Sequence, residues 1–145
     1  FVSEEYEPGR SYRGMATRPP KLVPGYDYVG EFVAFDPITG RRVWAYRSPS
    51  GAAMTAAALG TAGGIVFGGA ADRRFFALDA NTGDLLWGTR LNGDISGAPV
   101  TFEVDGRQYL AVGAGGRIGQ TTSYAPLTDT TISPGSGVMW VFALP

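Results

Sequence analysis

One feature of the sequence limits the possible folds more than any other: a segment of 13 residues occurs twice. Residues 32–44 and 75–87 each consist of an apolar run followed by the pattern Asp-x-x-Thr-Gly-x-x-x-Trp, and the second copy lies 43 residues after the first. Repeats spaced by roughly 40 to 50 residues are typical of arrays in which each small unit buries its apolar face only against its neighbours. We therefore expect a series of similar units packed side by side.

Each copy of the repeat predicts a β-hairpin. The Asp that opens the pattern, Asp36 or Asp79, can accept hydrogen bonds from turn amides, and Gly40 or Gly83 can adopt the positive φ that a tight turn requires. The Trp that ends each copy offers a large flat ring, which buries much area at a low cost in entropy. We expect these rings to fill the seams between successive units.

The second copy lies within a segment that has the pattern of four consecutive strands, as in one blade of a β-propeller. These strands are expected at residues 54–59, 65–69, 75–79 and 85–89. A further hairpin begins the next blade, and a run near the end of the sequence repeats the third-strand pattern. These three strands are expected at residues 98–104, 108–113 and 141–145. The predicted fold class is all-β, a β-propeller fragment of about two to three blades.

The blades at both ends of the chain are incomplete in this prediction. The first copy of the repeat follows an irregular Pro- and Tyr-rich lead-in at residues 1–29, and the last blade lacks its outer strand. Residues 30–145 would form the blades, with a long loop insertion at residues 114–137. Open strand edges are templates for further pairing that soluble proteins seldom leave exposed. We expect other polypeptide, either upstream sequence or a separate chain, to complete both blades, and the chain to be unstable alone.

The composition narrows the possible chemistry. The 22 Gly and 10 Pro among 145 residues fit many short strands joined by tight turns. With no Cys and no His, the chain lacks disulfides, thiolate nucleophiles and the commonest zinc ligand and general base. A net charge of −1 gives no basic surface for nucleic acid, and no apolar run is long enough to cross a bilayer. These properties fit a structural module or a redox enzyme whose chemistry belongs to an organic cofactor.

The two hairpins resemble the tryptophan-docking motifs of the eight-bladed quinoprotein dehydrogenases, which depend on pyrroloquinoline quinone (PQQ). Further segments are similar to the same family, at residues 50–55, 63–68, 93–102 and 106–112. The resemblance extends from about Gly30 to Pro145 and corresponds to the C-terminal part of the propeller. Non-catalytic PQQ-like propellers share the docking hairpin, and the combination with the Gly-Arg-Gln-Tyr hairpin makes the resemblance more specific.

The resemblance implies a periplasmic enzyme that oxidises alcohols, sugars or polyols with PQQ and a calcium or lanthanide ion. Such enzymes pass electrons to a cytochrome or a quinone, and in them an Asp accepts the proton of the substrate hydroxyl. The family's metal-binding Glu and Asn, its catalytic Asp and its paired cysteines lie in earlier blades, outside the matched segment. The resemblance therefore implies no catalytic or metal-ligating residue in this chain, and a partner in the N-terminal portion of the same propeller.

The resemblance also implies that PQQ lies on the propeller axis, where the innermost strands and the loops leading into them line the central channel. The candidates in this chain for contact with PQQ are Met54, Thr55, Ile95, Ser96 and Gly97. The Ser96 hydroxyl and backbone groups near Gly97 can hydrogen-bond a carboxylate or carbonyl, and Ile95 can make apolar contact. An alternative is that these residues only pack the end of the blade.

Other residues point to a function less directly. Asp94 is a carboxylate near the expected cavity mouth, and it is a candidate for contact with the substrate or with a solvent-linked metal. Asp36 and Asp79 are expected to be structural, because both lie in the same turn of the repeat. The insertion is a candidate for the substrate mouth or for a partner contact. The Gly-rich run at residues 113–116 has no helix pattern after it, so we reject nucleotide binding.

Two functions from different classes stay open at the level of the sequence. The first is the C-terminal part of a PQQ- and metal-dependent alcohol or sugar dehydrogenase. The second is a non-catalytic PQQ-like propeller that serves as a scaffold for protein binding, of the outer-membrane assembly lipoprotein type. Upstream sequence would discriminate between them, because an adjacent cysteine pair with the Glu, Asn and Asp set would establish the enzyme.

Overall fold

The computed structural model describes residues 2–3, 5–10, 12, 15–16, 21–115, 127 and 137–143. All its strands are paired in antiparallel sheets, which confirms the predicted all-β class. Within these residues, no helix is long and apolar enough to span a membrane. Most of the insertion predicted at residues 114–137 lies outside the described residues.

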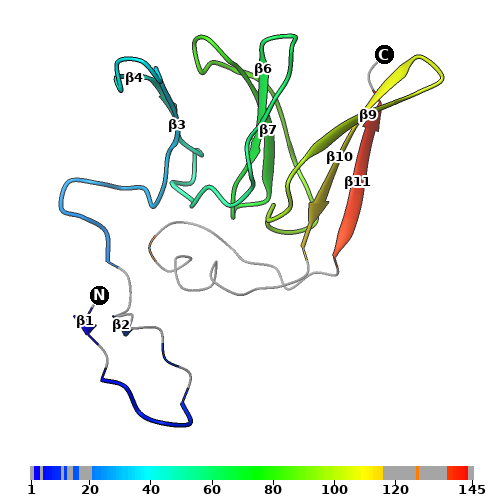
Figure 1. Ribbon diagram of the computed structural model, residues 1–145. Helices are drawn as coiled ribbons and strands as arrows, with labels where there is room; N and C mark the ends of the chain where they lie inside the picture. Colours follow the sequence, from blue (N-terminus) through cyan, green and yellow to red (C-terminus); the bar gives the residue numbers. More distant parts are fainter. Residues whose placement is uncertain are drawn as a thin grey trace.

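Three antiparallel sheets lie side by side, like successive wedges of a ring (Figure 1). The first sheet has two strands, the second four and the third three, and neighbouring strands are consecutive in the chain. The strands are β3 (Phe32–Phe35) and β4 (Arg42–Tyr46), then β5 (Leu59–Gly60), β6 (Ile65–Gly69), β7 (Arg74–Asp79) and β8 (Leu85–Arg90), then β9 (Val100–Val104), β10 (Arg107–Ala114) and β11 (Val138–Ala143). The second sheet is a complete blade between two partial ones.

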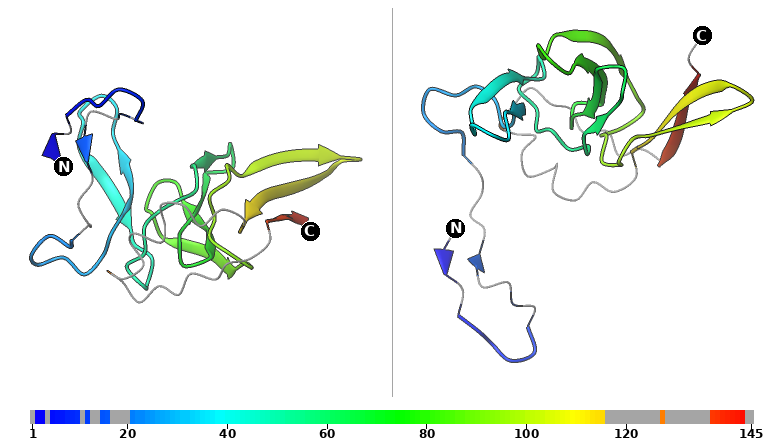
Figure 2. Two further views of the ribbon diagram at one scale, coloured as in Figure 1. Left: turned by 90° about the horizontal axis from the view of Figure 1, so that it is seen from below. Right: turned by 45° about the horizontal axis from the view of Figure 1, so that its top comes forward.

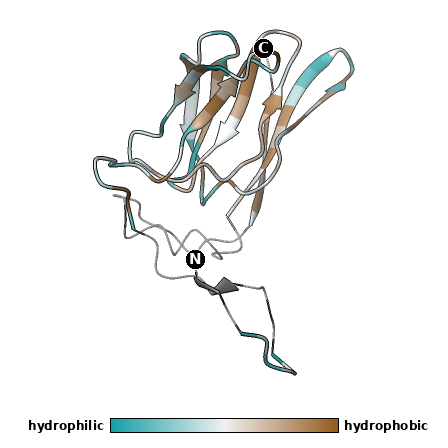
Figure 3. Cartoon of the chain, turned by 60° about the vertical axis from the view of Figure 1, so that its left-hand side comes forward, coloured by the Kyte–Doolittle hydropathy of each residue, from teal (hydrophilic) through white to brown (hydrophobic). Residues whose placement is uncertain are grey.

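The complete blade is buried on both faces at β7. Successive side chains of a strand point to opposite faces of the sheet. Phe75 packs in the seam with the third sheet, in a cluster that includes Ile95 and Val112. Phe76 and Leu78 pack in the seam with the first sheet. Hydrophobic residues accordingly lie along the strands, whereas many hydrophilic ones lie in turns and loops (Figure 3).

Both repeat turns are built as predicted. Oδ1 of Asp36 and Oδ1 of Asp79 each accept hydrogen bonds from the N–H groups two and three positions ahead, at 2.8 and 3.0 Å. These hydrogen bonds from turn amides lower the pKa of Asp36. Gly40 and Gly83 have φ values of +67° and +77°. Asp36 and Asp79 therefore both stabilise the turns in which they lie.

The docking role predicted for the repeated Trp is observed at Trp44. Its indole N–H donates to the backbone carbonyl of Ala80 in the turn after β7, at 2.9 Å. Its ring lies so close to Gly83 that a Cβ there would come within 2.7 Å. The equivalent ring in the second copy, Trp87, packs against Phe142 and is 41% exposed. In the first copy the Trp thus joins one blade to the next.

The inner strand of the complete blade differs from the prediction. The sequence pattern predicts a continuous strand at residues 54–59, but β5 contains only its end, and Met54 makes an isolated bridge to Ala70. The N–H groups of Thr55 and Ala56 both donate to the carbonyl of Gly69. One acceptor therefore faces two successive residues, which interrupts the regular ladder. The last strand also starts earlier than expected, since β11 begins at residue 138, and residues 144–145 lie outside the described residues.

The connections between strands fall into two sets at opposite ends of the sheets, because the strands alternate in direction (Figure 1). One end carries the turns at residues 36–41, 61–64, 80–84 and 105–106, which include both turns of the repeat. The other end carries residues 47–58 and 91–99, which lead into the inner strands β5 and β9, and residues 70–73, which join β6 to β7. We call these three segments the hub loops.

The strands β8, β9 and β11 carry exposed apolar side chains. They are Leu85, Leu86 and Trp87 on β8, Val100, Phe102 and Val104 on β9, and Val138, Met139, Trp140 and Val141 on β11. Such surfaces are buried against further blades in a closed propeller. The chain is therefore a fragment of a larger propeller. The short hairpin of β1 (Val2–Ser3) and β2 (Met15–Ala16) stands apart from the three sheets (Figure 2).

Candidate functional site at the hub loops

Backbone hydrogen bonds hold the hub loops together. The N–H of Ala71 donates to the carbonyl of Ala53 at 2.9 Å, and the N–H of Leu91 donates to the carbonyl of Arg73 at 2.9 Å. The turn at residues 70–73 therefore lies between the other two hub loops and is bonded to both. This arrangement brings the sequence-predicted candidates to one end of the fragment.

The structure joins two of these candidates directly. The hydroxyl of Thr55 donates to the backbone carbonyl of Ile95 at 2.7 Å, although the two residues are 40 positions apart. The side chain of Ile95 is fully buried and lies against Gly69. Met54 is half-buried and packs against the core beneath Phe76 and Leu78. The contacts predicted between these three residues and PQQ stay predictions.

Ser96 and Gly97 line a depression of about 340 Å³ with Gly113, Ala114, Gly115 and the start of β11. Ser96 is exposed and Gly97 is half-buried. Among the residues that the structure describes, neither backbone N–H has an acceptor, nor does the Ser96 hydroxyl have a partner. Gly97 approaches the backbone of Gly113, where a Cβ would come within 3.3 Å. The depression therefore combines small residues with free donors.

Asp94 is the candidate whose electrostatics are most unusual. It is 8% exposed, and no other described side chain donates a hydrogen bond to its carboxylate. Burial raises the pKa of Asp94, and a hydrogen bond from its own backbone N–H opposes that shift. Its backbone carbonyl accepts from the N–H of Gly115 at 2.9 Å. This hydrogen bond fixes the loop that contains Asp94, while the Asp94 carboxylate remains poorly solvated.

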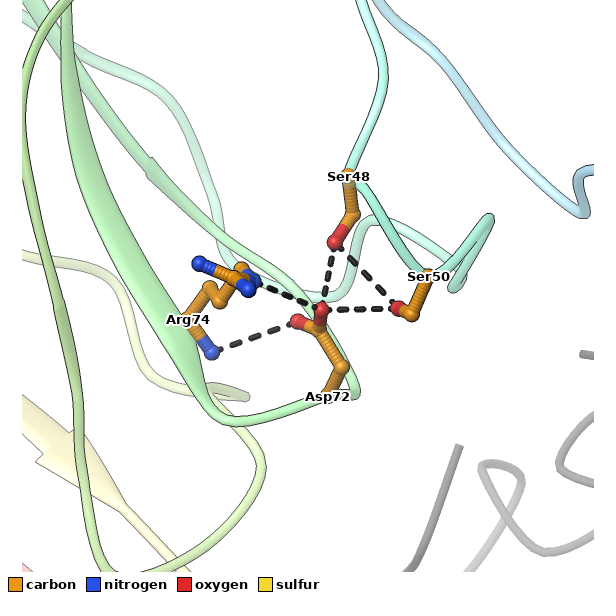
Figure 4. A network of polar contacts seen from close by, with 4 residues as sticks. All are labelled: Ser48, Ser50, Asp72 and Arg74. Carbon is orange, nitrogen blue, oxygen red and sulfur yellow. Dashed lines mark hydrogen bonds and ion pairs between the residues drawn. The ribbon is translucent and has the colours of Figure 1, made fainter. Parts of the chain in front are cut away.

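A second buried carboxylate lies in the hub loops, and the sequence analysis missed it (Figure 4). Asp72 is 3% exposed, and its Oδ2 accepts from the hydroxyls of Ser48 at 2.5 Å and Ser50 at 2.7 Å. Arg74 Nε lies 3.2 Å from the same oxygen in an ion pair, and the Arg74 backbone N–H donates to Oδ1 at 3.3 Å. No local pattern reveals this cluster, because its two loops are more than 20 residues apart.

The lead-in borders a separate depression of about 330 Å³, which Tyr26, Tyr28 and Leu127 help to line. The guanidinium of Arg47 lies over the ring of Tyr28 at 3.9 Å, and Arg47 also pairs with Glu31. These tyrosines therefore pack on the flank of the first sheet. Across the described residues, no group of three acidic side chains is arranged to hold a metal ion.

Comparisons with known proteins agree with this geometry. The PQQ family model described as "Glucose/ethanol/alcohol dehydrogenase, beta-propeller domain" matches residues 47–110. The chain is 38% identical over 143 residues to a quinoprotein ethanol dehydrogenase of Pseudomonas aeruginosa. The matched region covers 97% of this chain and 22% of that protein. It is 45% identical over 86 residues to a lupanine 17-hydroxylase (cytochrome c) of a Pseudomonas species, covering 59% of this chain and 12% of that protein.

A solved structure of a europium-containing methanol dehydrogenase superposes with a TM-score of 0.68 at 32% identity, over 83% of this chain and 24% of that one. The chain thus spans about a fifth of the length of the relative from P. aeruginosa, which is 22% covered. The sequence repeat, the arrangement of the sheets, the sequence comparisons and the structural comparison all indicate the same family. The chain belongs to the PQQ-dependent quinoprotein alcohol dehydrogenase family, as a C-terminal part of its β-propeller.

Proposed function

We propose that this chain supplies one wall of the PQQ cavity in a dehydrogenase that oxidises alcohols, sugars or polyols to aldehydes or ketones. The observation that carries the proposal is the set of donors at residues 96–97 that have no acceptor among the described residues and lie in a hub loop beside an open depression. Inner strands and the loops leading into them line the channel of a propeller. The resemblance to the quinoprotein dehydrogenases implies that the redox chemistry belongs to a cofactor in that channel.

The residues present fit one side of a flat, anionic cofactor. The N–H groups of Ser96 and Gly97 and the Ser96 hydroxyl can donate to a carboxylate or a carbonyl, and the small residues around them leave room for a ring system. When bound, PQQ would accept the two electrons removed from the alcohol. This chain's part would be to bind and orient the cofactor. The buried cluster that contains Ile95, in the seam between the second and third sheets, would exclude water from the edge of the cofactor.

We assign the metal, calcium or a lanthanide ion, and the catalytic base to the remaining blades of the propeller. The electron acceptor would be a cytochrome or a quinone, in line with the cytochrome c in the name of the lupanine relative. We also propose a periplasmic location, which rests on the family resemblance alone.

Reconstitution tests the proposal. The complete propeller that contains this chain, freed of cofactor and then supplied with PQQ and Ca²⁺ or a lanthanide, should reduce an artificial dye in the presence of ethanol or 1-butanol. Parallel assays with glucose and glycerol would establish whether sugars and polyols are substrates. Omission of PQQ is the control, and it should abolish dye reduction.

The alternative is a non-catalytic propeller scaffold that binds protein. The Trp44 docking contact is compatible with it, because that contact serves only the packing of blades. A complete protein that binds no PQQ and oxidises no alcohol with either metal would favour the scaffold over the dehydrogenase.

A further inference from the structure

We propose that Thr55 and Asp72 are positioning residues that set the direction of the Ser96 N–H toward the cofactor. The inference rests on the proposed function, because it assigns a role in PQQ binding to residues that do not themselves touch the cofactor. Its physical basis is a continuous chain of polar contacts through all three hub loops, from Asp72 to the peptide group between Ile95 and Ser96.

The first link is the anchoring of one hub loop on the next blade. The Asp72 carboxylate accepts from Ser48 and Ser50, which follow β4, while Asp72 itself lies in the turn between β6 and β7 (Figure 4). Charge-assisted hydrogen bonds to a buried carboxylate are stronger than neutral ones. Arg74 partly neutralises the charge through its ion pair with the same carboxylate. The loop after β4 is therefore fixed to the turn of the following blade.

The second link consists of the backbone hydrogen bonds that fix the loop between Ser48 and Thr55. The N–H of Gly51 donates to the carbonyl of Ser48 at 2.9 Å, which closes a turn directly after the anchored serines. The carbonyl of Ala53 then accepts from the Ala71 N–H at 2.9 Å, and the N–H of Thr55 donates to the Gly69 carbonyl at 3.0 Å. The backbone from residue 48 to residue 55 is thus bonded to the β6–β7 hairpin at several points.

The third link is the planar peptide group that Ile95 and Ser96 share. The Thr55 hydroxyl holds the Ile95 carbonyl at 2.7 Å. A trans peptide group is planar, with its N–H antiparallel to its C=O, and the described chain has no cis peptide bond. Fixing the Ile95 carbonyl toward Thr55 therefore directs the Ser96 N–H away from Thr55. That N–H has no acceptor within the described part of the chain.

The test is PQQ binding by the complete apo-propeller with Ca²⁺ present, measured by quenching of protein fluorescence, with the melting temperature measured in parallel. Thr55→Val keeps the shape and removes the hydroxyl, so we expect the Kd for PQQ to rise about tenfold, the effect of losing one well-placed hydrogen bond. Thr55→Ser should restore binding to within about threefold of wild type. Asp72→Asn should weaken binding several-fold.

Two matched variants separate positioning from general loss of stability. Thr61→Val removes a hydroxyl that donates to the Ile65 carbonyl at 3.1 Å, and Asp79→Asn alters a turn carboxylate, both at the opposite end of the same blade. Both controls should bind PQQ as wild type does. Wild-type affinity in folded Thr55→Val or folded Asp72→Asn, or equal weakening in the controls, would overturn the positioning role. A wild-type propeller that binds no PQQ would instead overturn the proposed function.

Discussion

Single residues of this fragment show how burial and hydrogen bonding divide carboxylates into two kinds. Asp72 and Glu31 lie among donors, and their charge is compensated by hydroxyls and guanidinium groups. Asp94 is buried to a similar degree as Asp72 but receives no donor from another described side chain. Because the cost of burying a charge depends on its partners, the pKa of Glu31 is lowered and that of Asp94 is raised, so the stability contributed by these two residues should depend on pH in opposite directions.

Asp94→Asn should stabilise the complete propeller at neutral pH. Burial raises the pKa of Asp94, so the folded protein keeps this proton to a higher pH than the unfolded chain, whose pKa is about 3.9. Stability is therefore lost as the pH rises from the unfolded value through the folded one. Urea unfolding should give the variant a higher free energy of unfolding than wild type at pH 7, with no difference at about pH 3. An equal difference between variant and wild type at both pH values would contradict this explanation.

Glu31→Gln should have the reverse pH dependence. The hydrogen bond from Arg47 lowers the pKa of Glu31, while burial opposes the shift. The pKa of Glu31 is lower in the folded protein than in the unfolded chain, where it is about 4.3, so the ionised side chain stabilises the fold above that pH. This stabilisation is lost as the pH falls through the pKa of the folded state. The variant should unfold at lower urea concentration than wild type at pH 7 and at the same concentration at about pH 2. A deficit that persists unchanged at low pH would contradict this explanation.

At the scale of elements, the hairpin between β7 and β8 is both a turn and a docking surface. Its turn satisfies its own amides through Asp79, and it receives the indole of Trp44 from the preceding blade. The hairpin between β3 and β4 has the same turn chemistry, and Gly40 has nothing within 4 Å of an added Cβ. The local structure of the two copies is therefore the same, and within this fragment the turn of the second copy is the one that receives a Trp ring.

Gly83→Ala and Gly64→Ala make an informative pair, because Gly64 lies in another turn of the same complete blade and has nothing within 4 Å of an added Cβ. Both glycines have positive φ, so each substitution should cost about 1 kcal/mol in backbone strain. Only Gly83→Ala also places a Cβ 2.7 Å from the Trp44 ring, which should add roughly 1 to 3 kcal/mol. Chemical denaturation of the complete propeller should therefore rank Gly83→Ala as the more destabilising. Equal losses would show that the Trp44 contact adjusts at no cost.

At the scale of the whole molecule, the fragment is a set of wedges whose outer surfaces are suited to further blades. The faces of β9 and β11 that turn away from the complete blade expose Val100, Phe102, Met139 and Val141. The strands β3 and β11 also present edges without partners among the described residues. Exposed apolar area and open edges together favour association with other chains.

The isolated 145-residue chain should accordingly behave as an incomplete fold. We expect it to bind the dye ANS, to sediment as aggregates and to lack a sharp thermal transition, whereas the complete propeller should bind little dye and melt cooperatively. Fluorescence and analytical ultracentrifugation of the two proteins at equal concentration test this. A monomeric isolated chain with a sharp thermal transition and no dye binding would be incompatible with the expected dependence on neighbouring blades.

The sequence by itself determined the all-β class, the blade period, both turns and the docking contact of Trp44. These features depend on residues close together in the chain or on the repeat, so their physical causes can be recognised locally. Ser96 and Gly97, which the sequence indicates as candidates, lie in the loop before β9 beside an open depression, and their contact with PQQ stays a prediction.

Only the tertiary structure decided the interrupted strand after Met54, the burial of Ile95, and the contacts that join Asp72 to Ser48 and Thr55 to Ile95. Those contacts join residues 24 and 40 positions apart, which lie in loops without a repeating pattern. The packing of one blade against the next determines which loop residues meet. A hydrogen bond across such a seam therefore depends on the position of the blades and leaves no periodic signal in the sequence.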